Sequence, residues 1–170
     1  MAVVFELVVN FGSDPGAARE AARGPLASTV LRAGARHVAC HPPLLNTRGP
    51  YAELSLIPVA VGYGVSLDRD LPRLRLSAAE LSELGHGLYA VLRRLDGYVA
   101  AAVGWDPEWQ LDTAGLAADW SEELADGSLD GHVVRESLRD ELGLGDAYVP
   151  FRPGYLWVPY RGETRPNFGG

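Results

Sequence analysis

Two carboxylates lie between two indoles in the run Trp105-Asp106-Pro107-Glu108-Trp109. Carboxylates beside aromatic rings are common parts of carbohydrate sites, where one acid donates a proton and the other is base or nucleophile, at a separation of about 5 to 9.5 Å. Asp106 and Glu108 are close enough in sequence to reach the shorter separation. Asp-Pro is also an ordinary turn pair, so a binding loop without chemistry is the stronger interpretation.

His37, Cys40 and His41 form the densest group of potential metal ligands in the sequence. Zinc needs three or four nitrogen or sulfur donors that converge on one point. On a strand, Cys40 points away from the two histidines, and the rise along the strand keeps the two imidazoles apart. A nucleophilic Cys40 with His41 as its base would lack a third group that orients the base. We therefore predict no catalytic residue, no metal and no cofactor.

Acidic side chains are concentrated in the last third of the chain. Between Trp105 and Asp146 there are twelve acidic residues and two arginines, out of 22 acidic and 15 basic residues in all. A helix predicted over 112–125 carries an anionic stripe that consists of Asp119, Glu122, Glu123 and Asp126. The stripe lacks arginines at i+3 or i+4, so its charges repel at a cost of about 0.2 to 0.5 kcal/mol per pair.

We interpret this stretch as a surface for a basic protein partner. An anionic surface steers cationic proteins and repels nucleic acids, and aromatic residues supply the desolvated contacts that dominate interface energy. The alternative is a solvated face, which most charge runs are. The expected partner-binding residues are Trp105, Asp106, Glu108, Trp109, Asp119, Trp120, Glu122, Glu123, Asp126, Tyr155 and Trp157.

The composition excludes several enzyme classes. All 15 basic residues are arginine, so an amine nucleophile, a Schiff base with pyridoxal phosphate and the lysine of a P-loop are excluded. A single cysteine allows no internal disulfide and fits a reducing compartment. The N-terminal run lacks the features of a secretory signal, and no stretch reaches the about 18 apolar residues of a membrane span. We expect a cytoplasmic protein without a membrane partner.

In charge and size, this small, acidic, lysine-free chain resembles the inhibitory or immunity proteins of bacterial toxin systems. The resemblance implies a non-enzymatic protein that neutralises or chaperones a basic protein partner. Two alternatives stay open. One is a small-ligand protein or hydrolase that uses Asp106 and Glu108 in an aromatic pocket, and the other is a homodimer in which the aromatic tail completes the sheet of another copy.

The predicted elements follow the order β-α-β-β-α-β. Asp14 and Pro15 open a helix that runs to about Arg23 and continues after a kink over 26–33, and Ser77 and Glu80 form a capping box for a helix that ends before Gly97. The strands are expected over 3–9, 36–40, 51–61 and 98–103. This order is that of a ferredoxin-like sandwich, an antiparallel sheet with helices on one face.

The last third is expected to be an α-rich, aromatic elaboration of one domain. With 170 residues and 47% apolar content, the chain suits a single core, and we place the single α+β domain over 1–160. Within it, 1–104 is the βαββαβ core and 105–160 the acidic elaboration, which includes a second helix predicted over 133–142. Residues 161–170 have little to bury and are expected to be disordered.

Overall fold

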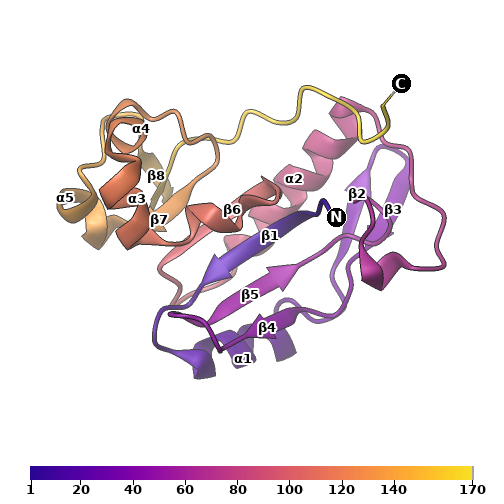
Figure 1. Cartoon of the computed structure of the whole chain (residues 1–170), viewed down its shortest axis with the longest axis horizontal. Helices are drawn as coiled ribbons and strands as arrows, with labels where there is room; N and C mark the ends of the chain where they lie inside the picture. The colour runs from indigo at the N-terminus through magenta and orange to yellow at the C-terminus, as the bar shows by residue number, and fades with distance from the viewer. Residues whose placement is uncertain (170) are drawn as a thin grey trace.

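The computed structural model, which describes residues 1–169, is a mixed α+β protein with a large antiparallel sheet (Figure 1). The seven strands of this sheet lie in the order β4-β5-β1-β6-β7-β9-β8, and every neighbouring pair is antiparallel. Their bounds are Phe5–Asn10 for β1, Leu44–Asn46 for β4, Glu53–Leu56 for β5, Ala100–Trp105 for β6, Val133–Arg135 for β7, Val149–Arg152 for β8 and Tyr155–Trp157 for β9. The α+β class predicted from the sequence is confirmed.

Two helices cover one face of the sheet. The first, α1 (Pro15–Arg23), begins where the Asp14 side chain accepts a hydrogen bond from the amide of Ala17, as predicted. The second, α2 (Ala78–Leu92), begins at the predicted capping box, in which Ser77 and Glu80 bond each other's amides. The buried side chains of both helices share one apolar cluster with alternate residues of β1.

The side chains of β1 alternate between the two faces of the sheet, as the pleat of a strand requires. Phe5, Leu7 and Val9 pack under α1 and α2. Val8 belongs to a small cluster on the opposite face, together with Ala102 and Leu111. By the same alternation, Glu6 and Asn10 face this second side, although both are buried. The second face therefore contains polar side chains close to its apolar ones.

A hairpin of β2 (Val30–Ala33) and β3 (Arg36–Ala39) forms a separate two-stranded sheet. The predicted continuation of the first helix over 26–33 is wrong. Gly24 ends the helix, and the burial of Leu31 and Ala33 between exposed neighbours has the period of a strand. The predicted strand over 36–40 is present, but it lies outside the large sheet, where β4 pairs with β5 instead.

The last third forms short elements around a second apolar cluster. The predicted helix over 112–125 is divided into α3 (Thr113–Asp119) and α4 (Ser121–Asp126), because Trp120 leaves the helical conformation. The helix predicted over 133–142 is wrong in its first part, where β7 pairs with β6 and β9 and its alternation places Val133 and Val134 in different apolar clusters. The rest is helical, as the 3-10 helix η3 (Glu136–Leu138) followed by α5 (Arg139–Leu142), and Gly143 ends it as predicted.

The tail after Tyr160 runs back along α2 toward the β2–β3 hairpin (Figure 1). The expectation of disorder needs correction for 161–169, because Asn167 is fully buried. Its amide nitrogen donates to the carbonyls of Val61 and Leu74 at 3.0 and 2.8 Å, and its Oδ1 accepts from the amide of Leu76 at 2.7 Å. These bonds compensate for the few apolar residues of the tail. Gly170 lies outside the described residues.

Candidate functional site

A groove of about 420 Å³ lies beside the sheet face that α1 and α2 do not cover. It is formed by the start of β5, the short helix η2 (Pro107–Gln110) and α3. Its lining consists of Tyr51, Glu53, Glu108, Trp109, Asp112, Gly115, Leu116, Asp119 and Trp120. We call it the acidic groove, because four of these nine side chains are carboxylates and none is basic.

The turn after β6 positions one wall of the acidic groove. Asp106 adopts a left-handed conformation with φ of 44°, and its Oδ1 accepts a hydrogen bond from the amide of Val4 at 2.8 Å. This bond ties the turn to the first strand, and Pro107 then begins η2. Glu108 and Trp109 follow on η2 with exposed side chains. Asp106 therefore holds the turn and is not part of the groove lining.

The first turn of α3 positions the opposite wall. The Asp112 side chain accepts a hydrogen bond from the amide of Gly115 at 3.1 Å and so caps the helix. A Cβ at position 115 would lie 2.8 Å from Asp112 Oδ2, so a side chain there would disturb the cap. Asp119 lies at the last position of α3 and Trp120 directly after it. The helix thus brings carboxylates from both of its ends to one groove.

Trp109 and Trp120 pack against each other at the groove. Their ring centroids are 4.6 Å apart with an interplanar angle of 36°. The two residues nevertheless remain 43% and 39% exposed. Large aromatic residues at this exposure are the type that a partner desolvates, and an indole face also attracts cations. The pair is therefore an exposed apolar surface next to acidic side chains.

Two carboxyl groups in and beside the groove, those of Glu6 and Glu53, have raised pKa values. Burial raises the pKa of Glu6 to about 7, and Glu108, Glu53 and Asp106 add to this shift, although a hydrogen bond to Ser55 opposes it. Burial, followed by the charge of Glu108, also raises the pKa of Glu53. Within residues 1–169 the ion pairs are His41–Asp68 and Arg152–Asp96, so no arginine neutralises the groove. The groove is a region of uncompensated negative charge.

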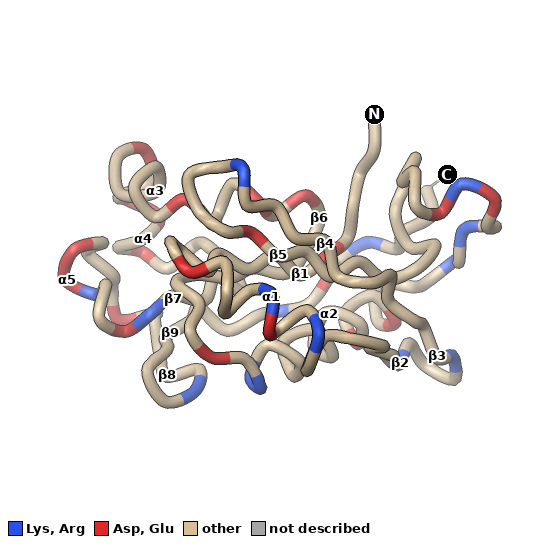
Figure 2. Tube along the Cα trace, turned by 90° about the horizontal axis from the view of Figure 1, so that it is seen from below, with Lys and Arg blue, Asp and Glu red and all other residues tan. Residues whose placement is uncertain are grey.

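Four predicted residues meet in the acidic groove: Glu108, Trp109, Asp119 and Trp120. The remaining acids of the predicted stripe, Glu122, Glu123 and Asp126, lie on α4 outside the groove lining. In Figure 2, acidic positions lie along α3, α4 and α5, and basic positions lie at α5, beside β7, at β8 and at the β2–β3 hairpin. The acids of the predicted stripe therefore continue along the chain beyond the groove lining.

The structure places the other predicted aromatic residues elsewhere. Trp105 packs against Phe5, with ring centroids 5.2 Å apart. Tyr155 is buried, stacks on Tyr98 at 4.1 Å and donates its hydroxyl hydrogen to the Tyr98 carbonyl. Trp157 packs against the ring of Tyr89 at 5.1 Å, under α2. These three side chains belong to the core that contains α2, not to the acidic groove.

Three lining residues of the groove, Tyr51, Glu53 and Asp112, were not among the site residues predicted from the sequence, where Asp112 was expected only as a helix cap. The buried acid beside the groove, Glu6, was also missed. Glu6 carried a signal, since it is a single charge inside an apolar strand. Glu53 carried none, because its position depends on the pairing of β5 with β1, in which it lies opposite Asn10. The expected set was restricted to the last third of the chain, whereas the groove also uses β5.

The other chemical candidates have structural explanations. Burial raises the pKa of Cys40 to about 12, so its thiol is a poor nucleophile near neutral pH. His41 Nε2 lies 2.6 Å from Asp68 Oδ1, a partner that the sequence did not reveal. Among residues 1–169, no three His, Cys, Asp or Glu side chains converge to hold a metal ion.

No family model, curated protein or solved structure matches this chain. Over the part of the chain that the structure describes, no helix has both the length and the apolar character that a membrane crossing requires.

Proposed function

We propose that this protein is a non-enzymatic binding module that neutralises or chaperones a basic protein partner through the acidic groove. The observation that supports this most directly is the exposed Trp109–Trp120 pair beside carboxylates without an ion-pair partner in residues 1–169. A surface that keeps like charges together without pairing them is less stable than a mixed one. A cationic partner would remove that repulsion on binding. We further propose that the protein acts in the cytoplasm.

The partner side chain that fits best is arginine. A guanidinium group can stack on an indole face while its N–H groups donate to carboxylates, which combines two recognition modes in one residue. Glu108 and Asp119 lie on opposite walls of the groove, and Trp109 and Trp120 adjoin them. An extended basic segment would place one arginine in the groove and further cations along the acids of α4.

We propose that a ferredoxin-like core presents this groove. The order β4-β5-β1-β6, the chain order β1-α1-β4-β5-α2-β6 and the shared cluster of α1 and α2 support this assignment. In this interpretation the β2–β3 hairpin is an insertion, and β7, β8 and β9 extend the sheet beyond β6. The sheet face opposite α1 and α2 then lies beside η2 and α3, and we propose that the partner binds on this side.

A short oligoarginine peptide tests the proposed function, with binding followed by tryptophan fluorescence and calorimetry. The double variant Glu108→Gln with Asp119→Asn should weaken binding about tenfold, since charge-assisted hydrogen bonds contribute more than 1 kcal/mol each. The matched control is Glu136→Gln with Glu141→Gln, which removes the same charge at exposed positions outside the groove. Equal losses in both double variants would mean that net charge alone attracts the peptide, and would overturn the groove as the site.

A further inference from the structure

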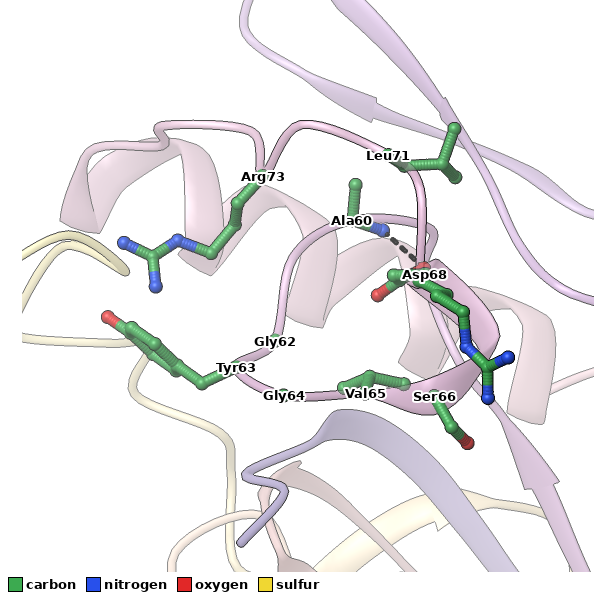
Figure 3. Close-up of a pocket in the computed structure, with 10 residues that line it drawn as sticks. Ala60, Gly62, Tyr63, Gly64, Val65, Ser66, Asp68, Leu71 and Arg73 are labelled. Atoms are coloured by element: carbon green, nitrogen blue, oxygen red, sulfur yellow. Dashed lines mark hydrogen bonds between the residues drawn. The ribbon is translucent and has the colours of Figure 1, made fainter.

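A second cavity of about 420 Å³ lies in the segment between β5 and α2 (Figure 3). Its lining consists of Ala60, Gly62, Tyr63, Gly64, Val65, Ser66, Asp68, Arg69, Leu71 and Arg73. We call it the 60–73 cavity. It shares no lining residue with the acidic groove, and its volume is within the usual range of small-ligand pockets.

One side of the 60–73 cavity holds a carboxylate in a fixed position. Asp68 Oδ1 accepts a hydrogen bond from the amide of Ala60 at 2.9 Å and lies 2.6 Å from Nε2 of His41. The Asp68 side chain is 11% exposed. Its second oxygen, Oδ2, is covered and accepts no hydrogen bond from residues 1–169, and Figure 3 shows it turned toward the cavity. A buried acceptor without a donor is unusual in a folded protein.

The facing side of the 60–73 cavity holds a cation. The Arg73 guanidinium carbon lies 4.0 Å from the centroid of the Tyr63 ring. The Tyr63 hydroxyl donates to the carbonyl of Asn167, and its ring packs on Trp105 at 5.9 Å, so the platform under the guanidinium is fixed. Unlike Arg135, which donates to two backbone carbonyls, Arg73 has no ion pair and no hydrogen bond within residues 1–169.

The backbone between these two sides leaves little freedom. Val3 and Tyr63 exchange two backbone hydrogen bonds of 2.9 Å, which fix the segment to the start of the chain. A Cβ at Gly62 would lie 2.6 Å from the carbonyl oxygen of Val3 and 2.8 Å from Cγ2 of Val65. A side chain at position 62 therefore does not fit, and the backbone at the Gly62–Tyr63 side of the 60–73 cavity is fixed before any ligand arrives.

We propose that the 60–73 cavity binds a small zwitterion, an amino acid or short peptide, whose carboxylate meets Arg73 and whose ammonium meets Asp68. Figure 3 shows the Arg73 and Asp68 side chains on opposite sides of the cavity. A simple anion would face the carboxylate of Asp68, and a simple cation would face the guanidinium of Arg73. A ligand with both charges pairs with both walls at once, through charge-assisted hydrogen bonds, whereas a simple anion would gain from Arg73 and the exposed Arg69 alone.

Because Oδ2 of Asp68 is covered, the proposal requires a small displacement at the edge of the 60–73 cavity before an ammonium contacts this oxygen. Arg69 and Leu71 line the cavity there, and both residues are exposed, so their side chains are free to move. The Arg73 end requires no such displacement. The two ends of the ligand therefore engage differently, the carboxylate on a preformed platform and the ammonium on a group that binding uncovers.

Three probes of equal length test this proposal: aminohexanoate, hexanoate and hexylamine, with glycine and aminobutyrate as shorter zwitterions. Binding is followed by calorimetry and by the NMR shifts of the backbone amides of residues 60–73. Aminohexanoate or one of the shorter zwitterions should bind at least about tenfold more tightly than either singly charged probe. Binding of hexanoate or hexylamine as tight as that of the best zwitterion, or no shift of these amides with any zwitterion, would overturn the proposal.

Two variants assign the ends of the ligand. Arg73→Gln should lower zwitterion affinity about tenfold. Asp68→Asn should also lower zwitterion affinity about tenfold, but it should not lower the affinity for hexanoate, which has no ammonium group. Arg48→Gln, an exposed arginine outside the cavity, is the matched control. If Asp68→Asn fails to fold, Arg73→Gln together with the three probes still decides the question. Oligoarginine binding should be unchanged in Arg73→Gln, so this proposal and the proposed function can fail independently.

Discussion

The acidic groove and the 60–73 cavity have the same volume, about 420 Å³, but they arrange charge in different ways. The groove collects carboxylates beside two exposed indoles, and burial together with the charge of Glu108 raises the pKa of Glu53 there. The cavity instead separates the carboxylate of Asp68 from the guanidinium of Arg73, each held by its own neighbours, and has the exposed Arg69 at its edge. The net charge of −7 of the whole chain is therefore consistent with the acidic groove, but it gives no indication of the cavity, where charges of both signs occur.

The largest effect is expected at the indoles of the acidic groove. Trp109→Ala and Trp120→Ala should each weaken oligoarginine binding by about 2 kcal/mol, because truncated aromatic anchors have effects of this size. Zwitterion binding should not change, since neither residue lines the 60–73 cavity. Calorimetry with both ligands measures this separation. Trp157→Phe, at a core position outside the groove, is the control. An equal loss of oligoarginine affinity in this variant would mean that Trp109 and Trp120 do not contact the peptide directly.

Removal of a buried acid should stabilise the groove side of the sheet. The pKa of Glu6 rises from 4.5 to about 7 on folding, so the wild type loses stability as pH rises through this range. Glu6→Gln should remove that loss and gain on the order of 1 to 3 kcal/mol at pH values above 7, with little gain below pH 4.5.

Urea unfolding of Glu6→Gln and wild type on both sides of this pH range tests the prediction. The matched control is Glu141→Gln, an exposed acid on α5. A stability difference that stays constant with pH would show that Glu6 does not titrate in this range. It would also weaken the contrast between the groove, which holds only acidic charges, and the cavity, which holds charges of both signs.

The smallest effect is expected at the cap of α3. Asp112→Ala removes the acceptor for the amide of Gly115 and should cost about 1 kcal/mol of folding free energy. Asp119→Ala removes the same charge from the groove at the other end of α3, where an anion opposes the helix dipole, and should cost nothing. Thermal unfolding distinguishes the two. If both variants lose equally, the cap contributes no more than the charge does.

Local signals allowed the capped helices to be predicted. Asp14 with Pro15 and Ser77 with Glu80 act within one turn of chain, so their neighbours in sequence are also their partners in space. The strand β7 has only three residues, too few to distinguish period two from period 3.6, and its valines pair with β6 and β9 from distant parts of the chain. The strand conformation of β7 could therefore not be predicted without knowing that it pairs with β6 and β9.

The candidate site divides in the same way. Glu108, Trp109, Asp119 and Trp120 lie within thirteen positions of one another in the chain, and their grouping was predictable. Glu53 joins them only through the register of β5 against β1. The facing of Asp68 and Arg73, and the bond between His41 and Asp68, depend on how a loop without regular periodicity folds back on itself.

Asn167 makes the tail a strap that ties distant parts of the chain together. A protease cut anywhere between Tyr160 and Asn167 would free this side chain and leave the carbonyls of Val61 and Leu74 and the amide of Leu76 without partners. The hydroxyl of Tyr63 would lose its acceptor in the same event. Such a cut would loosen the 60–73 cavity alone, because the acidic groove contains no residue after Trp120. We therefore expect limited proteolysis of this segment to disturb the 60–73 cavity and to leave the proposed binding groove unchanged.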